Sequence, residues 1–442
     1  MRTPFILIAF FYFLNVFSDV YQNKHEPLTI RMIAKDAAWL WFNNESVLLI
    51  NKTLYIGCED SLGNSQVVMY QIEDNPINFS GITYDISTWK MKRQRSPTHN
   101  YASLLQLQKR KILAVYHTSS NQMYYRIGKI LDTDKTTQRV DWGKETIVQL
   151  SSGINYSNLI KLNSLNKVFN FFSIYKQSPS MIVSRDNGKT WGHETLFMQQ
   201  GGTGTSPYMR LCSNGFDRID FLYTDGHPRT EMDNCIYHLY FKKHAFFRSD
   251  GSQVLSMNDL LKGPIKPDSG TKLYDGSFAG PGWVWDIEYD MDQNPVAAFI
   301  TSNDGEEGLD LRYHYAKWDG HNSKWFVGQI AYAGNHLYIP ENHFAGGITI
   351  DSENSNVVYI SSNVDPVTGR SITNRHYQIY QGVTSNAGYS WSWKQLTFDD
   401  DRDNLRPIVP KGHNLEICVI WFSQKLNPKK GFDSEIRGIF KK

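Results

Sequence analysis

Short runs of apolar residues separated by polar turns recur along the whole chain, and long amphipathic helical patterns are nearly absent. Runs of this kind, each roughly five to seven residues long, predict β-strands joined by tight turns. The clearest examples are residues 46–56, 111–117, 168–175, 218–224, 296–301 and 357–361. No linker rich in Pro and Ser divides the sequence, so we expect one all-β domain.

One turn motif occurs twice. Residues 184–191 read Ser-Arg-Asp-Asn-Gly-Lys-Thr-Trp and fit the Asp-box pattern in full, whereas residues 384–391 read Thr-Ser-Asn-Ala-Gly-Tyr-Ser-Trp and form a degenerate copy. In such a turn the Asp accepts backbone N–H bonds, the Gly adopts a positive φ and the Trp packs between neighbouring sheets. The motif is typical of a turn within a β-propeller blade, remote from the active centre.

The spacing of Trp residues predicts the number of blades. Trp89, Trp142 and Trp191 are separated by intervals of 53 and 49 residues, and each interval suits one four-stranded blade. The chain therefore predicts a single β-propeller with seven blades, although six or eight are also compatible with its length.

The composition excludes several classes of protein. The formal net charge is +2 and charged residues make up 20% of the chain, which argues against a nucleic-acid partner because such proteins carry a strong basic excess. Aromatic residues make up 14%, which argues against disorder. No apolar run reaches the length of a membrane span.

The N-terminus predicts secretion. Met1-Arg2 precedes an almost wholly apolar stretch, residues 6–17, and Ser18 follows it. This order is typical of a signal peptide over residues 1–18, which leaves a mature propeller over residues 19–442. The alternative is a buried N-terminal strand. Four cysteines permit two disulfides, but their spacing matches no known framework.

The first candidate for chemistry is a pair of histidines. Residues 101–117 read as a hairpin whose turn lies near Gln108 and Lys109. Pairing across that turn places His99 and His117 nearly opposite each other at the open end, within side-chain reach. Two adjacent imidazoles suit proton transfer or metal binding. The alternative is two unrelated surface histidines.

The second candidate is the turn Thr-Asp-Gly-His-Pro-Arg at residues 224–229, directly after a predicted strand. His227 and Arg229 at a strand end suit an anionic substrate, although the turn can equally be an ordinary solvated one. Soft metal ligation is a further alternative, with a spacing that is not diagnostic. Its candidate ligands are His227, Cys235, His238 and Cys212.

Other polar residues begin predicted innermost strands, where propellers place their sites. Tyr156 is a candidate general acid or a core residue. Tyr208 and Arg210 begin the strand before the His227 turn, and Arg406 begins the strand of the last blade. Each of these three is either a substrate-binding residue or a packing residue.

Taken together, these motifs resemble the BNR-4-type β-propellers, and the resemblance covers nearly the whole mature chain. It rests on the His99 and His117 hairpin, the Tyr-Ser-Asn at 156–158, the Asp-box and the turn at 224–229. Later segments agree: Trp-Val-Trp-Asp at 283–286, Tyr-His-Tyr-Ala-Lys-Trp-Asp-Gly at 313–320, Ala-Gly-Gly-Ile at 345–348 and Val-Tyr-Ile-Ser at 358–361. Characterised relatives are polysaccharide lyases, including ulvan lyases and rhamnose–glucuronate lyases. The resemblance implies β-elimination at a uronate within a uronic-acid-containing polysaccharide.

That reaction implies roles for the candidate residues. A base removes the C5 proton, cationic or donor groups neutralise the carboxylate, and an acid protonates the leaving O4. His117 or His99 is the candidate base, with the other binding the carboxylate. Tyr156 matches the relatives' catalytic Tyr as acid or combined acid and base, and Arg229 is the candidate partner of the carboxylate. No cofactor is required, although a structural calcium or zinc ion is compatible with the fold.

The sequence departs from the relatives at one position. The resemblance implies an Arg on the strand that pairs with the Tyr156 strand, but residues 169–173 read Phe-Asn-Phe-Phe-Ser, and the next Arg downstream is Arg185. Two alternatives to a lyase follow from this. One is a carbohydrate-binding propeller without catalysis. The other is a sialidase-like hydrolase, for which the sequence offers no convincing carboxylate pair.

Overall fold

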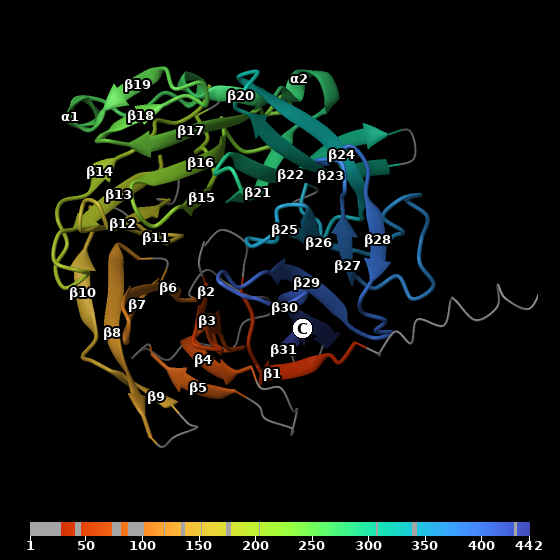
Figure 1. The fold of residues 1–442 in the computed structure, drawn as a ribbon, viewed down its shortest axis with the longest axis horizontal. Helices are drawn as coiled ribbons and strands as arrows, with labels where there is room; N and C mark the ends of the chain where they lie inside the picture. Colours follow the sequence, from red (N-terminus) through yellow and green to blue (C-terminus); the bar gives the residue numbers. More distant parts are fainter. Residues whose placement is uncertain are drawn as a thin grey trace, which may run out of the picture.

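The computed structural model describes most of the chain, namely residues 28–39, 46–72, 81–86, 101–118, 120–133, 138–151, 153–173, 178–202, 204–305, 308–337, 343–427 and 431–442. Its strands form seven antiparallel sheets arranged around a common centre (Figure 1). The chain is a seven-bladed β-propeller, as the Trp spacing predicts.

The first three blades follow one another in sequence order. Blade 1 consists of β2 (Val47–Ile50), β3 (Thr53–Glu59), β4 (Ser65–Gln71) and β5 (Ile82–Asp85). Blade 2 consists of β6 (Ser103–Gln108), β7 (Lys111–His117), β8 (Gln122–Asp132), β9 (Gln138–Trp142) and β10 (Thr146–Gln149). Blade 3 consists of β11 (Asn158–Leu162), β12 (Lys167–Phe172), β13 (Ser180–Ser184) and β14 (Thr195–Leu196).

The next three blades include the largest one. Blade 4 consists of β15 (Met209–Ser213), β16 (Arg218–Thr224), β17 (Ile236–Lys242), β18 (Ala245–Phe247), β19 (Gln253–Ser256) and β20 (Thr271–Tyr274). Blade 5 consists of β21 (Gly282–Tyr289), β22 (Pro295–Gly305), β23 (Gly308–Asp319) and β24 (Lys324–Gly334). Blade 6 consists of β25 (Gly347–Ile350), β26 (Val357–Ser362), β27 (Gln378–Val383) and β28 (Ser392–Gln395). The described helices are single turns near blade 4, namely α1 (Met257–Leu260), α2 (Gly276–Ala279) and a 3₁₀ turn (Pro267–Ser269).

Blade 7 closes the ring with strands from both ends of the chain. It contains β29 (Asp403–Ile408), β30 (Ile417–Asn427), β31 (Gly431–Lys441) and, at its outer edge, β1 (Arg31–Lys35). β1 pairs antiparallel with β31, with Arg31 opposite Gly438. Main-chain hydrogen bonds between the two ends of the chain therefore hold the ring closed. Of the helices described, none has the length and apolar character needed to span a bilayer.

In blades 1 to 6 the first strand of the blade lies nearest the centre, and in blade 7 β29 takes this place (Figure 1). These innermost strands are β2, β6, β11, β15, β21, β25 and β29. They run in the same direction along the propeller axis, because each blade proceeds outward through antiparallel neighbours. We call the face where the innermost strands begin the entry face, and the face where they end the exit face.

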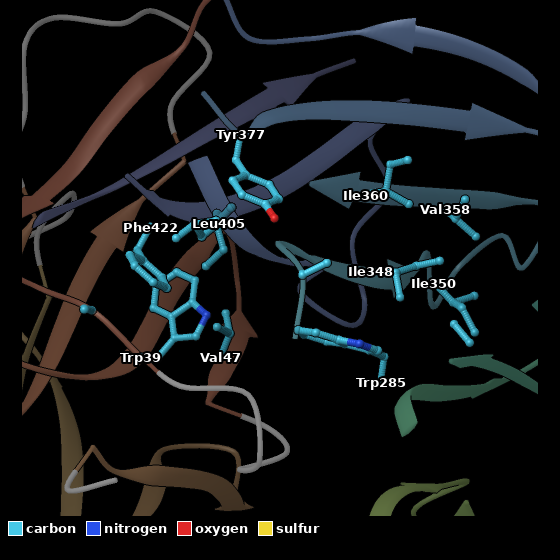
Figure 2. Close-up of a cluster of buried hydrophobic side chains, with 14 of the residues drawn as sticks. Trp39, Val47, Trp285, Ile348, Ile350, Val358, Ile360, Tyr377, Leu405 and Phe422 are labelled. Atoms are coloured by element: carbon cyan, nitrogen blue, oxygen red, sulfur yellow. The ribbon is translucent and has the colours of Figure 1, made fainter. Parts of the chain in front are cut away.

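Large buried side chains fill the space between the innermost strands. Trp39 packs edge-on against Phe422 with ring centroids 5.7 Å apart, and Figure 2 shows Trp285 next to the Ile348 segment. Arg406, within β29, joins this core with φ of 53°. Its Nη1 donates to the Trp39 carbonyl at 3.0 Å, and Trp39 Nε1 donates to the Arg406 carbonyl at 3.3 Å. Arg406 is therefore a structural clamp between blade 7 and the N-terminal segment.

The two Asp-box turns have nearly identical hydrogen bonds. In the intact copy, Thr190 N donates to Asp186 Oδ1 at 2.9 Å, and Gly188, with φ of 79°, donates to Ser184 Oγ at 2.8 Å. In the degenerate copy, Ser390 N donates to Asn386 Oδ1 at 2.9 Å. An amide oxygen thus replaces the carboxylate without loss of the turn. Both turns lie on the exit face, and their Trp side chains pack on the preceding blades, against Tyr125 and Tyr315.

Two sequence-based expectations need correction. Residues 46–56 are two strands, β2 and β3, because Asn51 and Lys52 both adopt positive φ (49° and 65°) and form a tight hairpin turn. The cysteines do not form the two disulfides that their number permits: Cys58, Cys212, Cys235 and Cys418 are all buried free thiols.

Candidate functional site

Aromatic and imidazole side chains from four blades meet on the entry face. Tyr156 precedes β11, Tyr208 precedes β15, Trp283 is the second residue of β21, and His343 lies just before β25. Each of these positions is at or just before the start of an innermost strand, where the blades converge. The ring of blades therefore brings together residues that are far apart in sequence.

We call this group the entry-face cluster, and Tyr208 is at its centre. The Tyr208 ring lies 4.6 Å from Trp283, 5.4 Å from His227 and 6.0 Å from Tyr156, measured between centroids. His343 lies 5.0 Å from His227 and 5.2 Å from Trp283. Three residues predicted from the sequence, Tyr156, Tyr208 and His227, therefore share one site.

The turn that carries His227 is held rigidly. Gly226 N donates to Asn234 Oδ1 at 2.9 Å, and Asn234 Nδ2 donates to the Gly282 carbonyl at 2.8 Å, which ties the turn to the start of β21. On the other side, His227 N donates to Thr205 Oγ1 at 3.1 Å, and that hydroxyl donates to Glu231 Oε1 at 2.7 Å. The position of the imidazole is therefore fixed before any ligand arrives.

The hydrogen bonds of His227 also define its tautomer. The Arg229 backbone N–H donates to His227 Nδ1 at 3.2 Å, so Nδ1 is an acceptor and the neutral ring carries its proton on Nε2. Burial and then the charge of Arg229 lower the pKa of His227 to about 4. At neutral pH His227 thus presents an N–H donor and no net charge.

His343 behaves in the same way. Its side chain is 1% exposed. Burial, followed by the neighbouring His227 and Arg229, lowers its pKa to about 3. Arg229 itself is exposed. The cluster therefore combines two neutral imidazoles with one accessible cation, an electrostatic setting that attracts an anionic group.

Tyr156 and Tyr208 border a narrow pocket between blades 3 and 4, together with Ser173 and Pro207. The strand that pairs with the Tyr156 segment carries no Arg over residues 169–173, where the resemblance implies one. Asn170 is fully buried, its Oδ1 accepts from Asn158 N at 3.0 Å, and its Nδ2 lies 3.2 Å from Ser157 Oγ. This position is therefore a structural amide that secures the Tyr156 segment.

The hairpin with His117 is confirmed, but its register differs from the predicted one. Ser103 pairs with Val115, so continuing the pairing brings Tyr101 opposite His117. The difference arises because the turn lies at Lys109 and Arg110, later than predicted, and a bulge near Leu107 offsets only part of that displacement. His99 itself lies outside the described residues.

His117 lies at the entry end of β7 and is 1% exposed. It pairs with Met123, whose sulfur is 3.2 Å from Asn170 Nδ2. In addition, the Ser103 hydroxyl donates to the Ser157 carbonyl. His117 therefore adjoins the Tyr156 segment through this buried network. Its present environment is that of an interior residue.

Arg210 is placed less directly. It is the second residue of β15, shortly after Tyr208. It pairs with Leu222 and is half-buried. Its predicted role in substrate binding stays a prediction.

His238 belongs to a different network within blade 4. Its Nε2 lies 2.9 Å from Asp220 Oδ1 and its Nδ1 lies 2.8 Å from Ser249 Oγ. Asp220 also accepts two bonds from Arg218, each 2.7 Å long, and one from the Tyr289 hydroxyl at 2.5 Å. Both nitrogens of His238 are thus occupied within the protein.

The alternative of a soft metal site at His227, Cys235, His238 and Cys212 therefore has no support. Within the described ranges, no group of three or more His, Cys, Asp or Glu side chains is arranged to hold a metal ion. The geometry around His238 gives the physical reason, because its ring nitrogens already bind Asp220 and Ser249.

Two members of the entry-face cluster were not predicted as site residues. His343 and Phe344 lie before β25 in a segment without strand periodicity, and their ring centroids are 4.3 Å apart. Trp283 was noted only as part of the family resemblance. A signal for both was available in principle, because each directly precedes or begins an innermost strand.

The chain belongs to the BNR repeat-containing family: the sequence model of that family, BNR_4, matches residues 53–332. This match covers more than half of the chain and confirms the resemblance found in the sequence. No curated protein sequence matches the chain.

Among solved structures, an ulvan lyase of polysaccharide lyase family PL25 superposes with a TM-score of 0.64. The identity is 12%, over 91% of this chain and 94% of that chain. A PL25 ulvan lyase structure bound to -[GlcA(1-4)Rha3S]- gives the same values. At this identity the likeness shows that the two proteins share the propeller fold.

Proposed function

We propose that this protein is a secreted polysaccharide lyase that cleaves a rhamnose–glucuronate linkage by β-elimination. The observation that carries the proposal is the entry-face cluster, in which Tyr156 and Tyr208 lie beside two neutral imidazoles and the exposed Arg229. The shared fold with ulvan lyases, one of them bound to a glucuronate–rhamnose fragment, supports the substrate class. The apolar stretch before Ser18 supports secretion.

The carboxylate of the uronate is assigned to His227 and Arg229. Elimination requires that the carboxylate be neutralised, because only then does the C5 proton become acidic enough to leave. His227 offers its Nε2–H, since Nδ1 is occupied by the Arg229 backbone. The Arg229 guanidinium supplies the positive charge. Together they replace the Arg that is missing from β12, where Asn170 is committed to the backbone of the Tyr156 segment.

The proton transfers are assigned to Tyr156. In a gluco-configured uronate, the C5 proton and the O4 leaving group depart from the same side of the ring. One phenol can therefore take the C5 proton as phenolate and return a proton to O4 as the new C4–C5 double bond forms. His117, buried in the adjoining blade, and His99 are the alternative bases.

The test is to incubate the mature chain with ulvan, rhamnose-capped arabinogalactan and polygalacturonate and to follow the ultraviolet absorbance of unsaturated uronate. The proposal expects a rise with a polymer that contains rhamnose–glucuronate linkages, and none with polygalacturonate. Tyr156→Phe and Arg229→Ala are expected to abolish or strongly reduce the rise. The exposed histidine of the exit side, His193, provides the control variant His193→Ala, which should leave it unchanged.

Two results would redirect the proposal. New reducing ends without ultraviolet absorbance would identify a hydrolase. Retention of the polymer without any new ends would identify a binding propeller, which is the alternative that the absence of an Arg from residues 169–173 favours.

A further inference from the structure

A groove lies on the exit face between blades 5 and 6, away from the entry-face cluster. Three turns form it: the β21–β22 turn, the β23–β24 turn and the degenerate Asp-box after β27. The groove encloses about 560 Å³, and its lining includes Trp318, Phe326, Tyr389, Asp292, Lys317 and His321. We call it the Trp318 groove. Its volume is within the range of small-molecule and saccharide sites.

Aromatic rings form one side of the groove at three depths. Trp318 is 6% exposed and forms part of the floor, while Tyr389 is 73% exposed at the rim. Between them lies the half-buried Phe326, whose ring centroid is 4.3 Å from that of Tyr389. The Phe326 and Tyr389 rings are tilted by 46° to each other, and they give this side of the groove an apolar surface.

The position of Tyr389 in its turn is informative. In the intact Asp-box the same position is occupied by Lys189, so the turn does not require an aromatic residue there. The degenerate turn nonetheless holds Tyr389 rigidly, because Thr384 Oγ1 accepts from Gly388 N at 3.0 Å and Asn386 Oδ1 accepts from Ser390 N at 2.9 Å. A large exposed ring on a fixed turn is typical of a contact surface.

The polar side of the groove offers both donors and acceptors. Asp290 is paired with Lys317 at 3.0 Å, so these two charges offset each other. Asp319 accepts the backbone N–H of His321 at 3.0 Å, which holds the β23–β24 turn in place. Asp292 and His321 are exposed at the rim. Hydroxyl groups, which donate and accept at once, complement such a mixed lining.

We propose that the Trp318 groove binds a neutral pyranose segment of a polysaccharide. The apolar C–H face of a pyranose stacks on an aromatic ring, while its hydroxyls bond to carboxylate and ammonium groups at the edge. A uronate would meet the carboxylates of Asp292 and Asp319.

The ligand is a chain rather than a single sugar. A second hollow of about 340 Å³, lined by Glu288, Tyr289, Glu353 and Lys411, adjoins the groove at Asp290 and extends it toward the propeller axis. Its Glu288 and Lys411 form an ion pair at 3.0 Å, and Glu353 adds a further carboxylate acceptor. Consecutive sugar units can therefore occupy the groove and the adjoining hollow.

This site is independent of the proposed lyase activity, because it lies on the opposite face and shares no residue with the entry-face cluster. A chain held on the exit face would keep the protein on a branched or insoluble polymer while the entry face acts on other segments. Such bivalent attachment raises apparent affinity without a new contact at the entry face.

The test is affinity electrophoresis of the full chain in gels that contain a neutral galactan, xylan or β-glucan, with polygalacturonate in a parallel gel. Tyr389→Ala and Asp292→Asn are compared with Phe398→Ala, which removes an equally exposed ring (70%) elsewhere. Thermal unfolding confirms that each variant is folded. Retardation in parallel gels with and without pentalysine in the sample tests the cationic alternative.

The proposal expects at least one neutral polymer to retard the wild type. It expects Tyr389→Ala to weaken that binding about tenfold or more, as truncation of an aromatic anchor does, and Phe398→Ala to leave it unchanged. Failure of every neutral polymer to retard the wild type would overturn the proposal. Equal retardation of Tyr389→Ala, or a response to pentalysine alone, would also overturn it. Because binding is measured directly, each result is interpretable whether or not the protein is a lyase.

Discussion

Histidines occupy two contrasting regions of this propeller. In blade 4, His238 is fully buried, and Asp220 and Ser249 occupy both of its ring nitrogens at 2.9 Å and 2.8 Å. On the entry face, His227 uses Nδ1 to accept from its own turn, and its neighbouring charge is the cation Arg229. Burial lowers the pKa of both histidines.

The difference lies in what surrounds each ring. The Asp220 network satisfies its polar groups internally and so fastens blade 4, with Tyr289 of blade 5 added at 2.5 Å. The entry-face cluster surrounds its imidazoles with aromatic rings, beside the exposed Arg229. In this propeller His238 is therefore part of the internal network of blade 4, whereas His227 belongs to the candidate site at the converging strand ends.

The largest effect is expected at the entry face. Tyr156→Phe removes only the phenolic oxygen, so packing against Tyr208 is kept. Loss of general acid–base catalysis should lower kcat by about 10²- to 10⁴-fold, with an unchanged melting temperature. The measurement is the initial rate of ultraviolet absorbance increase on the responsive polymer. A variant with wild-type kcat would remove Tyr156 from the mechanism.

A substitution in the Asp220 network of blade 4 should lower the free energy of unfolding. Asp220→Asn keeps the shape but leaves Arg218 without its buried counter-charge, which costs about 3–5 kcal/mol of unfolding free energy. Urea unfolding measures the loss. His193→Ala, an exposed histidine, serves as the control and should be neutral. If Asp220→Asn unfolds at the same urea concentration as the wild type, the Asp220 network does not stabilise blade 4.

Arg229 should affect binding more than folding. Arg229→Ala removes a charge-assisted partner of the carboxylate, worth about 1.5–3 kcal/mol, and should raise KM by about 10- to 100-fold. Arg229→Lys should recover part of this loss because it restores the charge without the planar fork. Steady-state kinetics on one polymer fraction measures both variants. An unchanged KM would assign the carboxylate to another group.

The smallest effect concerns pH. The folded-state pKa of His343, about 3, lies below its ordinary value of 6.5. Its neutral form therefore stabilises the fold above pH 6.5, and that contribution is lost as pH falls toward 3, since the unfolded chain binds the proton first. His343→Asn should flatten the fall in melting temperature between pH 6.5 and 4.

The comparison with the wild type is essential in this experiment because Asp225 acts in the opposite direction. Burial raises the pKa of Asp225 to about 6, which stabilises the folded state as pH falls below that value. The difference between the two melting curves isolates His343. Parallel curves would show that His343 does not titrate as described.

Local patterns in the sequence were sufficient for the architecture. The Asp-box and the Trp spacing predict seven blades, and the strands 111–117 and 218–224 match β7 and β16 at both ends. The turn with His227 and Arg229 is also predictable, because it directly follows a strongly apolar strand. These features depend on residues that are close together in the chain.

Which residues meet at the candidate site depends on how the seven blades close around the axis. His343, before blade 6, joins His227 of blade 4 because blade 5 lies between them and its Trp283 contacts both imidazoles, a convergence that follows from the order of the blades around the axis. The register of the hairpin depends on the exact place of its turn, so the sequence could not fix which residue faces His117. The absence of an Arg from residues 169–173 could be read from the sequence, but the bonds of Asn170 to Asn158 and Ser157 required the structure.

The most direct test of the central claim is to digest the responsive polymer and to weigh both products of each cleaved bond by mass spectrometry. The account predicts an unsaturated non-reducing end that is one water lighter than the matching hydrolysis product, beside an ordinary reducing end that keeps the linkage oxygen, with neither formed by Tyr156→Phe. Saturated ends on both sides of every cleaved bond would contradict it, because water would then have been consumed.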